Sequence, residues 1–111
     1  MTIPSSVVDI KDGVFDGCKS LKEVVLEERS RLEKIGSACF RGTWVEGIVI
    51  PKGVEEIRES TFTGCEHLKE VVFEEGSWLK TIEERAFSDC ASLKNIRFPN
   101  GLRQIGAECF S

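Results

Sequence analysis

The sequence predicts a β-rich α/β solenoid, in which similar turns of chain stack along one axis. First, an Ile is followed five residues later by a Phe at positions 10/15, 35/40, 57/62, 82/87 and 105/110. Second, successive Ile residues are 25, 22, 25 and 23 residues apart, within the roughly 20–29-residue period of leucine-rich repeats. Third, an apolar run with the spacing of a strand recurs along the chain. Together these features predict a leucine-rich-repeat solenoid.

Each repeat is expected to place one short strand on the concave side. The runs follow the pattern apolar-x-x-apolar-x-apolar, and their period-two ending and their Val and Ile content favour β structure. The runs are Leu21-Val24-Leu26, Val45-Ile48-Ile50, Leu68-Val71-Phe73 and Leu93-Ile96-Phe98. We therefore expect a right-handed solenoid with a parallel concave sheet that gains one strand per repeat.

The convex side is expected to hold short strands and 3-10 or helical turns. An apolar residue three positions before each Ile brings the chain onto this side. The Phe then opens a stretch rich in Gly, Ser and Asp, such as Phe62-Thr63-Gly64-Cys65, which is typical of turns. The second repeat departs from the others, since it reads Phe40-Arg41-Gly42-Thr43 and lacks one residue before its strand.

The whole chain, 1–111, is expected to form one solenoid domain. Its repeats lie at approximately 3–25, 26–49, 50–72, 73–97 and 98–111, the last being incomplete. The turn after the strand is alternately short and two residues longer, so the repeating unit is interpreted as a pair of repeats. Because the chain stops at Phe110-Ser111 without a polar cap, we expect a fragment of a longer array or a module that self-associates through its open ends.

Composition excludes several classes of protein. The net charge of −4 and the interspersed Lys, Arg and Glu argue against nucleic-acid binding, which requires a basic stripe. No apolar run is long enough for a membrane-spanning helix. The first residues lack the basic and apolar regions of a secretory signal, so the sequence does not reveal the compartment directly.

The five cysteines are interpreted mainly as small packing residues. Cys18, Cys65 and Cys90 recur three residues after the Phe and are expected to stack in one internal column. A disulfide between Cys65 and Cys90 is geometrically allowed, because adjacent strands bring their backbones close enough. Cys39 and Cys109 belong to a second column of small residues. Cys109 lies beside the end of the chain, where an exposed thiol could oxidise or pair between chains.

No constellation of residues predicts catalysis, a metal site or a cofactor. His67 is the only histidine, and no Ser/His/Asp or Cys/His set accompanies it, so it is interpreted as a solvated loop residue. Two acidic pairs, Glu27-Glu28 and Glu74-Glu75, follow strands. Without a DxDxDG-type loop they are interpreted as a solvated edge rather than a calcium site. Phosphate-binding Gly motifs are absent. We therefore expect a protein that is not an enzyme.

The candidate binding surface is the outward face of the predicted concave sheet. Its partner-binding residues are predicted to be Glu23, Val25, Val49, Glu70, Val72, Asn95 and Arg97. Three stacked valines form a contiguous apolar ladder, a type of patch associated with partner binding, although β propensity alone would also favour Val at these positions. Trp78, in a long turn, is a second candidate anchor, with packing of its ring over its own turn as the alternative.

The repeated pattern Ile-Pro-x-x-Val-x-x-Ile-(4)-Phe-x-x-Cys-x-x-Leu-x-x-Val resembles the BspA-type leucine-rich repeat of surface proteins from mucosal bacteria and protozoa. The resemblance covers residues 3–110 and depends on Ile3-Pro4, Ile50-Pro51, Gly17-Cys18, Gly64-Cys65 and Ala86-Phe87. It implies a non-catalytic adhesin module, at the cell surface or secreted, that binds extracellular matrix, serum or neighbouring-cell proteins. The alternative is a structural segment that assembles end to end, including as a homodimer.

Overall fold

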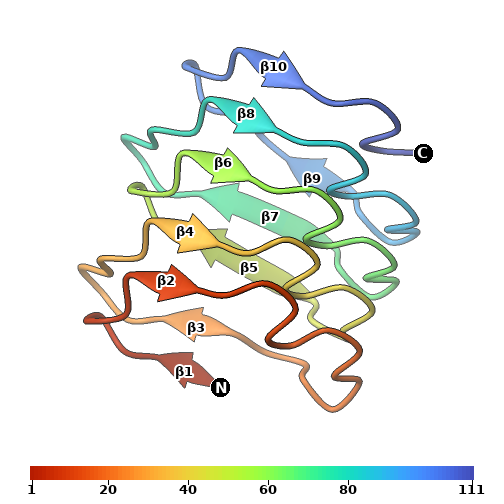
Figure 1. Cartoon of the computed structure of the whole chain (residues 1–111), viewed down its shortest axis with the longest axis horizontal. Helices are drawn as coiled ribbons and strands as arrows, with labels where there is room; N and C mark the ends of the chain where they lie inside the picture. The colour runs from red at the N-terminus through yellow and green to blue at the C-terminus, as the bar shows by residue number, and fades with distance from the viewer.

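The computed structural model describes residues 1–111 and shows a solenoid of about five turns with parallel strands (Figure 1). Turns one to five each place one strand on each of two sides. The first sheet comprises β1 (Thr2–Ile3), β3 (Val25–Leu26), β5 (Gly47–Ile50), β7 (Glu70–Phe73) and β9 (Asn95–Ile96). The second sheet comprises β2 (Asp9–Ile10), β4 (Lys34–Ile35), β6 (Glu56–Ile57), β8 (Thr81–Ile82) and β10 (Gln104–Ile105).

Side chains alternate across the first sheet as the apolar runs predict. In β5, Ile48 and Ile50 are buried and Val49 between them is exposed. The register pairs Val49 with Val72 and Ile50 with Phe73 of the next turn, so like residues stack in columns along the solenoid. In the second sheet the recurring Ile of each turn points inward and is buried in turns one to four. The structure therefore confirms the parallel solenoid.

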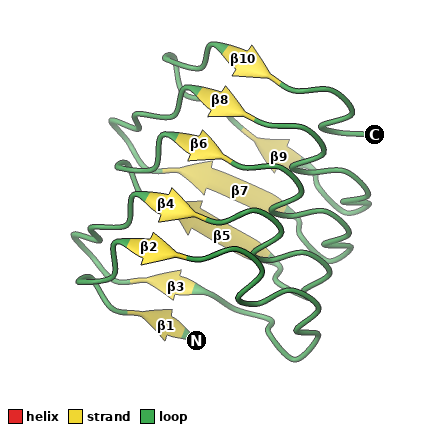
Figure 2. Cartoon of the chain, viewed as in Figure 1, coloured by secondary structure: helices red, strands yellow, loops and turns green.

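The third side of each turn is the segment around the recurring Phe, and it is not helical. The structure contains no helix, so the α/β class and the helical or 3-10 turns of the sequence prediction are not confirmed (Figure 2). Residues two before and two after the Phe have positive φ, for example Ala38 at 55° and Gly42 at 68°. A left-handed residue ends a right-handed helical run, so only single turns form, such as Cys65 N–H donating to Phe62 O.

Backbone hydrogen bonds join these segments into a ladder. Around Phe40, the N–H groups of Ala38, Phe40 and Gly42 donate to carbonyls of the next turn, and the same three bonds recur at all four junctions. The ladder satisfies the main-chain donors that a helix would otherwise have satisfied. This arrangement holds Ala38 and the equivalent residues in a conformation that costs a non-glycine residue roughly 1 kcal/mol or more.

A column of phenylalanine rings runs through the core beside this ladder. The rings of Phe15, Phe40, Phe62, Phe87 and Phe110 stack in sequence. Their centroids lie 5.3–5.5 Å apart, and adjacent ring planes differ by 15° or less. The three inner rings are almost completely buried. Offset stacking at this separation is favourable beyond the burial of area, so the column fixes the spacing of the turns.

Both sheets are interrupted between turns two and three. The first sheet divides into β1-β3 and β5-β7-β9, and the second into β2-β4 and β6-β8-β10. At this seam the Phe-side ladder is intact, and Trp44 N–H and Glu46 N–H still donate to Leu21 O and Lys22 O. The solenoid is thus two hydrogen-bonded units that are joined mainly along the Phe side.

Two sequence features coincide with the seam. Pro51 has no N–H, so it cannot donate to the Leu26 carbonyl across the junction. The loop between Phe40 and Val45 is also one residue shorter than its counterparts, which changes how β5 approaches β3. No helix in the structure is long and apolar enough to cross a membrane.

We predict that the amide of Ile35 exchanges with solvent at least about tenfold faster than the amides of Ile57 and Ile82 in native-state hydrogen exchange. The three residues occupy equivalent positions and are equally buried. Ile57 and Ile82 pair with a strand of the next turn, whereas β4, which contains Ile35, has no paired strand in turn three. Exchange is measured residue by residue by NMR. Equal protection of the three amides would show that the seam is closed in solution.

Candidate functional site

The first sheet presents a ladder of exposed valines. Val25, Val49 and Val72 are 45%, 51% and 41% exposed. Val49 and Val72 pair in register, and Val25 holds the equivalent strand position in turn two, across the seam. Arg97, which directly follows β9, takes the place of Val in turn five and is also exposed. We call these four residues the valine column. Large apolar side chains at the same strand position in three successive turns form an exposed strip rather than scattered exposed residues.

A charged column accompanies the valine column. It consists of Glu23, Gly47, Glu70 and Asn95, of which Glu70 pairs in register with both Gly47 and Asn95. Neither Glu23 nor Glu70 makes an ion pair through its carboxylate. The structure thus brings all seven residues of the predicted partner surface onto one face, with an apolar strip beside free carboxylates.

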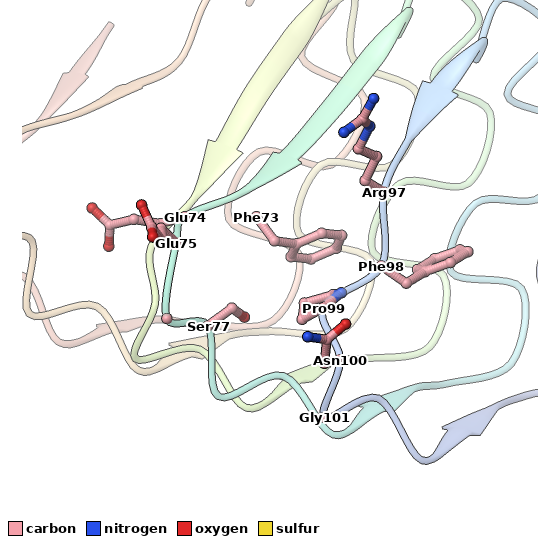
Figure 3. Close-up of a pocket in the computed structure, with 10 residues that line it drawn as sticks. Phe73, Glu74, Glu75, Ser77, Arg97, Phe98, Pro99, Asn100 and Gly101 are labelled. Carbon is pink, nitrogen blue, oxygen red and sulfur yellow. The ribbon is translucent and has the colours of Figure 1, made fainter.

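A hollow of about 400 Å³ opens at the turn-five end of this face. It is lined by Glu70, Val71, Val72, Phe73, Asn95 and Arg97. A neighbouring hollow of about 360 Å³ shares Phe73 and Arg97 with it and extends past Phe98, Pro99 and Asn100 towards Ser77 (Figure 3). Arg97 therefore stands between two surface depressions. Both form because β9 ends after two residues, whereas β7 continues for four.

Trp78 lies in the long turn between β7 and β8 and lines none of the hollow at the turn-five end of this face. Its side chain is 62% exposed, so the ring does not pack closely over its own turn. It lines a separate hollow of about 480 Å³ with Glu55, Lys80 and Arg103. Trp78 is available to a partner, but not as part of the valine column.

Sequence reasoning missed an aromatic pair on the surface. The rings of Trp44 and His67 pack against each other with centroids 4.5 Å apart, and the Lys22 ammonium lies 6.0 Å from the Trp44 ring. His67 is exposed, as a solvated loop residue would be, yet its ring has a partner. The sequence did contain a signal for this pair. Both residues directly precede the first apolar residue of a strand run, so they hold equivalent positions in adjacent turns.

The acidic pairs after the strands link adjacent turns. A Glu27 carboxylate oxygen accepts the Ser5 N–H at 2.8 Å, and a Glu74 oxygen accepts the Lys52 N–H at 2.9 Å. Each long turn thereby caps the short turn before it, which supports the pairing of repeats seen in the turn lengths. No group of three or more His, Cys, Asp or Glu side chains is placed to hold a metal ion.

The cysteines are free thiols, and two of them do not lie where the sequence suggested. Cys65 and Cys90 donate to the Phe40 and Phe62 carbonyls of the preceding turns at 3.0 and 3.1 Å. Cys18 is exposed rather than internal, and no carbonyl accepts its thiol as Phe40 O and Phe62 O accept those of Cys65 and Cys90. Cys109 is buried rather than exposed, because its side chain packs into the core.

Burial makes most of these thiols weak acids. Burial raises the pKa of the Cys39 thiol to about 11 and that of the Cys90 thiol to about 12. It also raises the pKa of the Cys65 and Cys109 thiols. The thiolate is the reactive species, so these four side chains are poor nucleophiles at neutral pH.

Comparisons with known proteins agree with this architecture. The family pattern described as a BspA type leucine-rich repeat region matches residues 1–111 in six copies. The crystal structure of the pneumococcal vaccine antigen PcpA superimposes with a TM-score of 0.88 and 32% identity, covering 98% of this chain and 27% of PcpA. A leucine-rich cell surface protein from Faecalibacterium prausnitzii A2-165 gives a TM-score of 0.62 and 26% identity, covering 97% of this chain and 36% of that protein.

The chain thus spans about a quarter of the length of PcpA and about a third of the length of the Faecalibacterium protein. No curated protein sequence matches it.

We predict that only Cys18 reacts rapidly with a thiol reagent in the native protein at pH 8, because it alone is exposed. Cys39, Cys65 and Cys109 should react only after unfolding, since burial blocks access, and the half-buried Cys90 should react slowly because its raised pKa of about 12 holds it protonated. Mass spectrometry of the labelled protein before and after addition of guanidinium chloride measures this. Rapid native labelling of Cys65 or Cys90 would contradict the buried column.

Proposed function

Because this chain belongs to the BspA-type leucine-rich repeat family, we propose that it is a non-catalytic protein-binding module of a cell-surface protein. The valine column and the carboxylates beside it form the binding face. Extracellular matrix, serum or neighbouring-cell proteins are the proposed partners. Trp78 is proposed as a second anchor, on a separate part of the surface.

The single observation that carries this proposal is the exposed ladder of Val25, Val49 and Val72. Their backbone positions are held by the core and by the backbone hydrogen bonds beside the phenylalanine column, so binding would require little ordering of the main chain. Val49 and Val72 lie on paired strands, so this part of the strip is preformed and loses little conformational entropy when a partner covers it. The free carboxylates of Glu23 and Glu70 add charge selectivity along its edge.

Surface location is supported by the two structural neighbours. One is described as a vaccine antigen and the other as a cell surface protein. Both contain this fold as part of a longer chain. We therefore propose that this chain also acts at the cell surface or after secretion, as one segment of a larger binding protein.

We predict that the double substitution Val49→Glu and Val72→Glu weakens partner binding at least about tenfold, because burying two carboxylates without partners is unfavourable. Binding is measured by biolayer interferometry against a panel of extracellular matrix and serum proteins. The free energy of unfolding should fall by only about 1 kcal/mol, since both side chains are exposed but the two new carboxylates lie opposite each other in register.

Val14→Glu is the matched control, because Val14 is 50% exposed on the Phe side of the solenoid. It should leave binding unchanged. If the double variant remains folded and binds every protein of the panel as the parent does, the valine column is not the binding face.

A second function, end-to-end assembly, is favoured by the exposed face of turn five. Ile105 is 45% exposed and Phe110 is 47% exposed, whereas their counterparts Ile82 and Phe87 are buried. Stacking a second copy on this face would continue the phenylalanine column and bury these side chains. The surface would then act as a self-association site.

If this second function is correct, sedimentation velocity should show a dimer whose fraction rises with protein concentration. Ile105→Lys should return the protein to a monomer, because it places a charge in the apolar contact. A single monomeric species at every concentration would rule out assembly by the isolated chain.

A further inference from the structure

The binding face changes character at turn five. Along the valine column, Val25, Val49 and Val72 are followed by Arg97. Along the charged column, Glu70 is followed by Asn95. Both changes make the same end of the face more positive. An apolar strip therefore ends in a cation, at a position where three earlier turns carry Val.

The Arg97 guanidinium has no partner within the molecule. It takes part in none of the seven ion pairs of the chain and in no side-chain hydrogen bond. The five N–H donors of the guanidinium thus face solvent beside an apolar patch.

Arg97 lies in a surface hollow that combines apolar and polar side chains. The side chain lines the hollow of about 400 Å³ together with Val72, Phe73 and Asn95. The hollow offers apolar walls from Val72 and Phe73, a side-chain amide from Asn95 and the guanidinium fork from Arg97. A planar guanidinium fork matches the two oxygens of a carboxylate.

Resting on the proposed function of this face, we propose that its partner is an extended acidic–aliphatic peptide segment. Aliphatic side chains of the segment cover Val49 and Val72, and a carboxylate at one end pairs with Arg97. Neighbouring strands of a sheet lie about 4.8 Å apart, so one extended segment can span turns three, four and five. Charge complementarity thereby sets the direction in which the segment lies along the solenoid.

Glu70 refines this arrangement. Glu70 lines the same hollow, pairs in register with Asn95 and makes no ion pair. It repels a carboxylate of the ligand, which therefore binds on the Asn95–Arg97 side. Removing the charge of Glu70 strengthens binding, whereas removing the charge of Arg97 weakens it.

The experiment uses the whole chain and three fluorescent octapeptides of alternating Ser and Leu that end in Asp-Glu, Asn-Gln or Lys-Lys. Fluorescence anisotropy gives the dissociation constants. We expect the Asp-Glu peptide to bind about threefold to fivefold more tightly than the Asn-Gln peptide, as for an exposed ion pair, with the difference lost at high salt. The Lys-Lys peptide should bind more weakly than the Asn-Gln peptide at this end of the face.

Arg97→Gln should remove the preference for the Asp-Glu peptide, Glu70→Gln should increase it, and Arg97→Glu should transfer it to the Lys-Lys peptide. Arg31→Gln is the matched control, because Arg31 is exposed, unpaired and on a long turn away from this face. The control should leave all three constants unchanged. NMR of labelled valine methyls shows whether bound peptide contacts Val72.

The outcomes separate this inference from the proposed function. In one outcome, Val49→Glu with Val72→Glu abolishes partner and peptide binding while Arg97→Glu leaves the peptide preference unchanged. The face then binds, but Arg97 does not select for the charge of the ligand, and the inference fails. If the peptides bind with the Arg97-dependent preference but no panel protein binds, the inference holds and the class of protein partner must be revised. Equal binding of all three peptides to the parent chain overturns the inference.

Discussion

The rest of the structure depends on the phenylalanine column and the backbone ladder beside it. The recurring Phe of turns one to four contributes twice, because its ring stacks on a ring of an adjacent turn and its N–H donates to the next turn. Main chain and side chain of one residue therefore fix the same spacing. The left-handed residues on either side of the Phe are unfavourable alone, and the three ladder bonds at each junction compensate for them.

Because the column fixes the spacing, differences in repeat length must be absorbed elsewhere. The step of 22 residues between Ile35 and Ile57 leaves the Phe40–Phe62 stack at 5.5 Å, the same distance as at the last junction. The sheets lose their hydrogen bonds at this point instead. The seam forms here because ring stacking and the backbone ladder are kept at this junction, whereas the hydrogen bonds between the strands are lost. It also gives the solenoid a built-in boundary between units.

This division of roles leaves the outward face free to vary. Val49 and Val72 contribute little to the core, because they point away from it, so stability does not dictate their identity. Arg97 can occupy the position that Val holds in three earlier turns for the same reason. A rigid inner column with variable outer columns suits a module that displays a surface, and the vaccine antigen PcpA and the Faecalibacterium cell surface protein share the same architecture.

The sequence by itself determined the repeat period, the parallel stacking, the alternation of buried and exposed residues in each strand and the residues on the candidate face. All of these follow from hydrophobic periodicity, which acts within one repeat and is then copied. The tertiary structure decided the absence of helices, since left-handed residues such as Arg85 are stabilised only by bonds to the next turn. It also decided the exposure of Cys18, the burial of Cys109, the Trp44–His67 pair and the seam. Each of these depends on which turn covers which, and contacts between turns have no local pattern in the sequence.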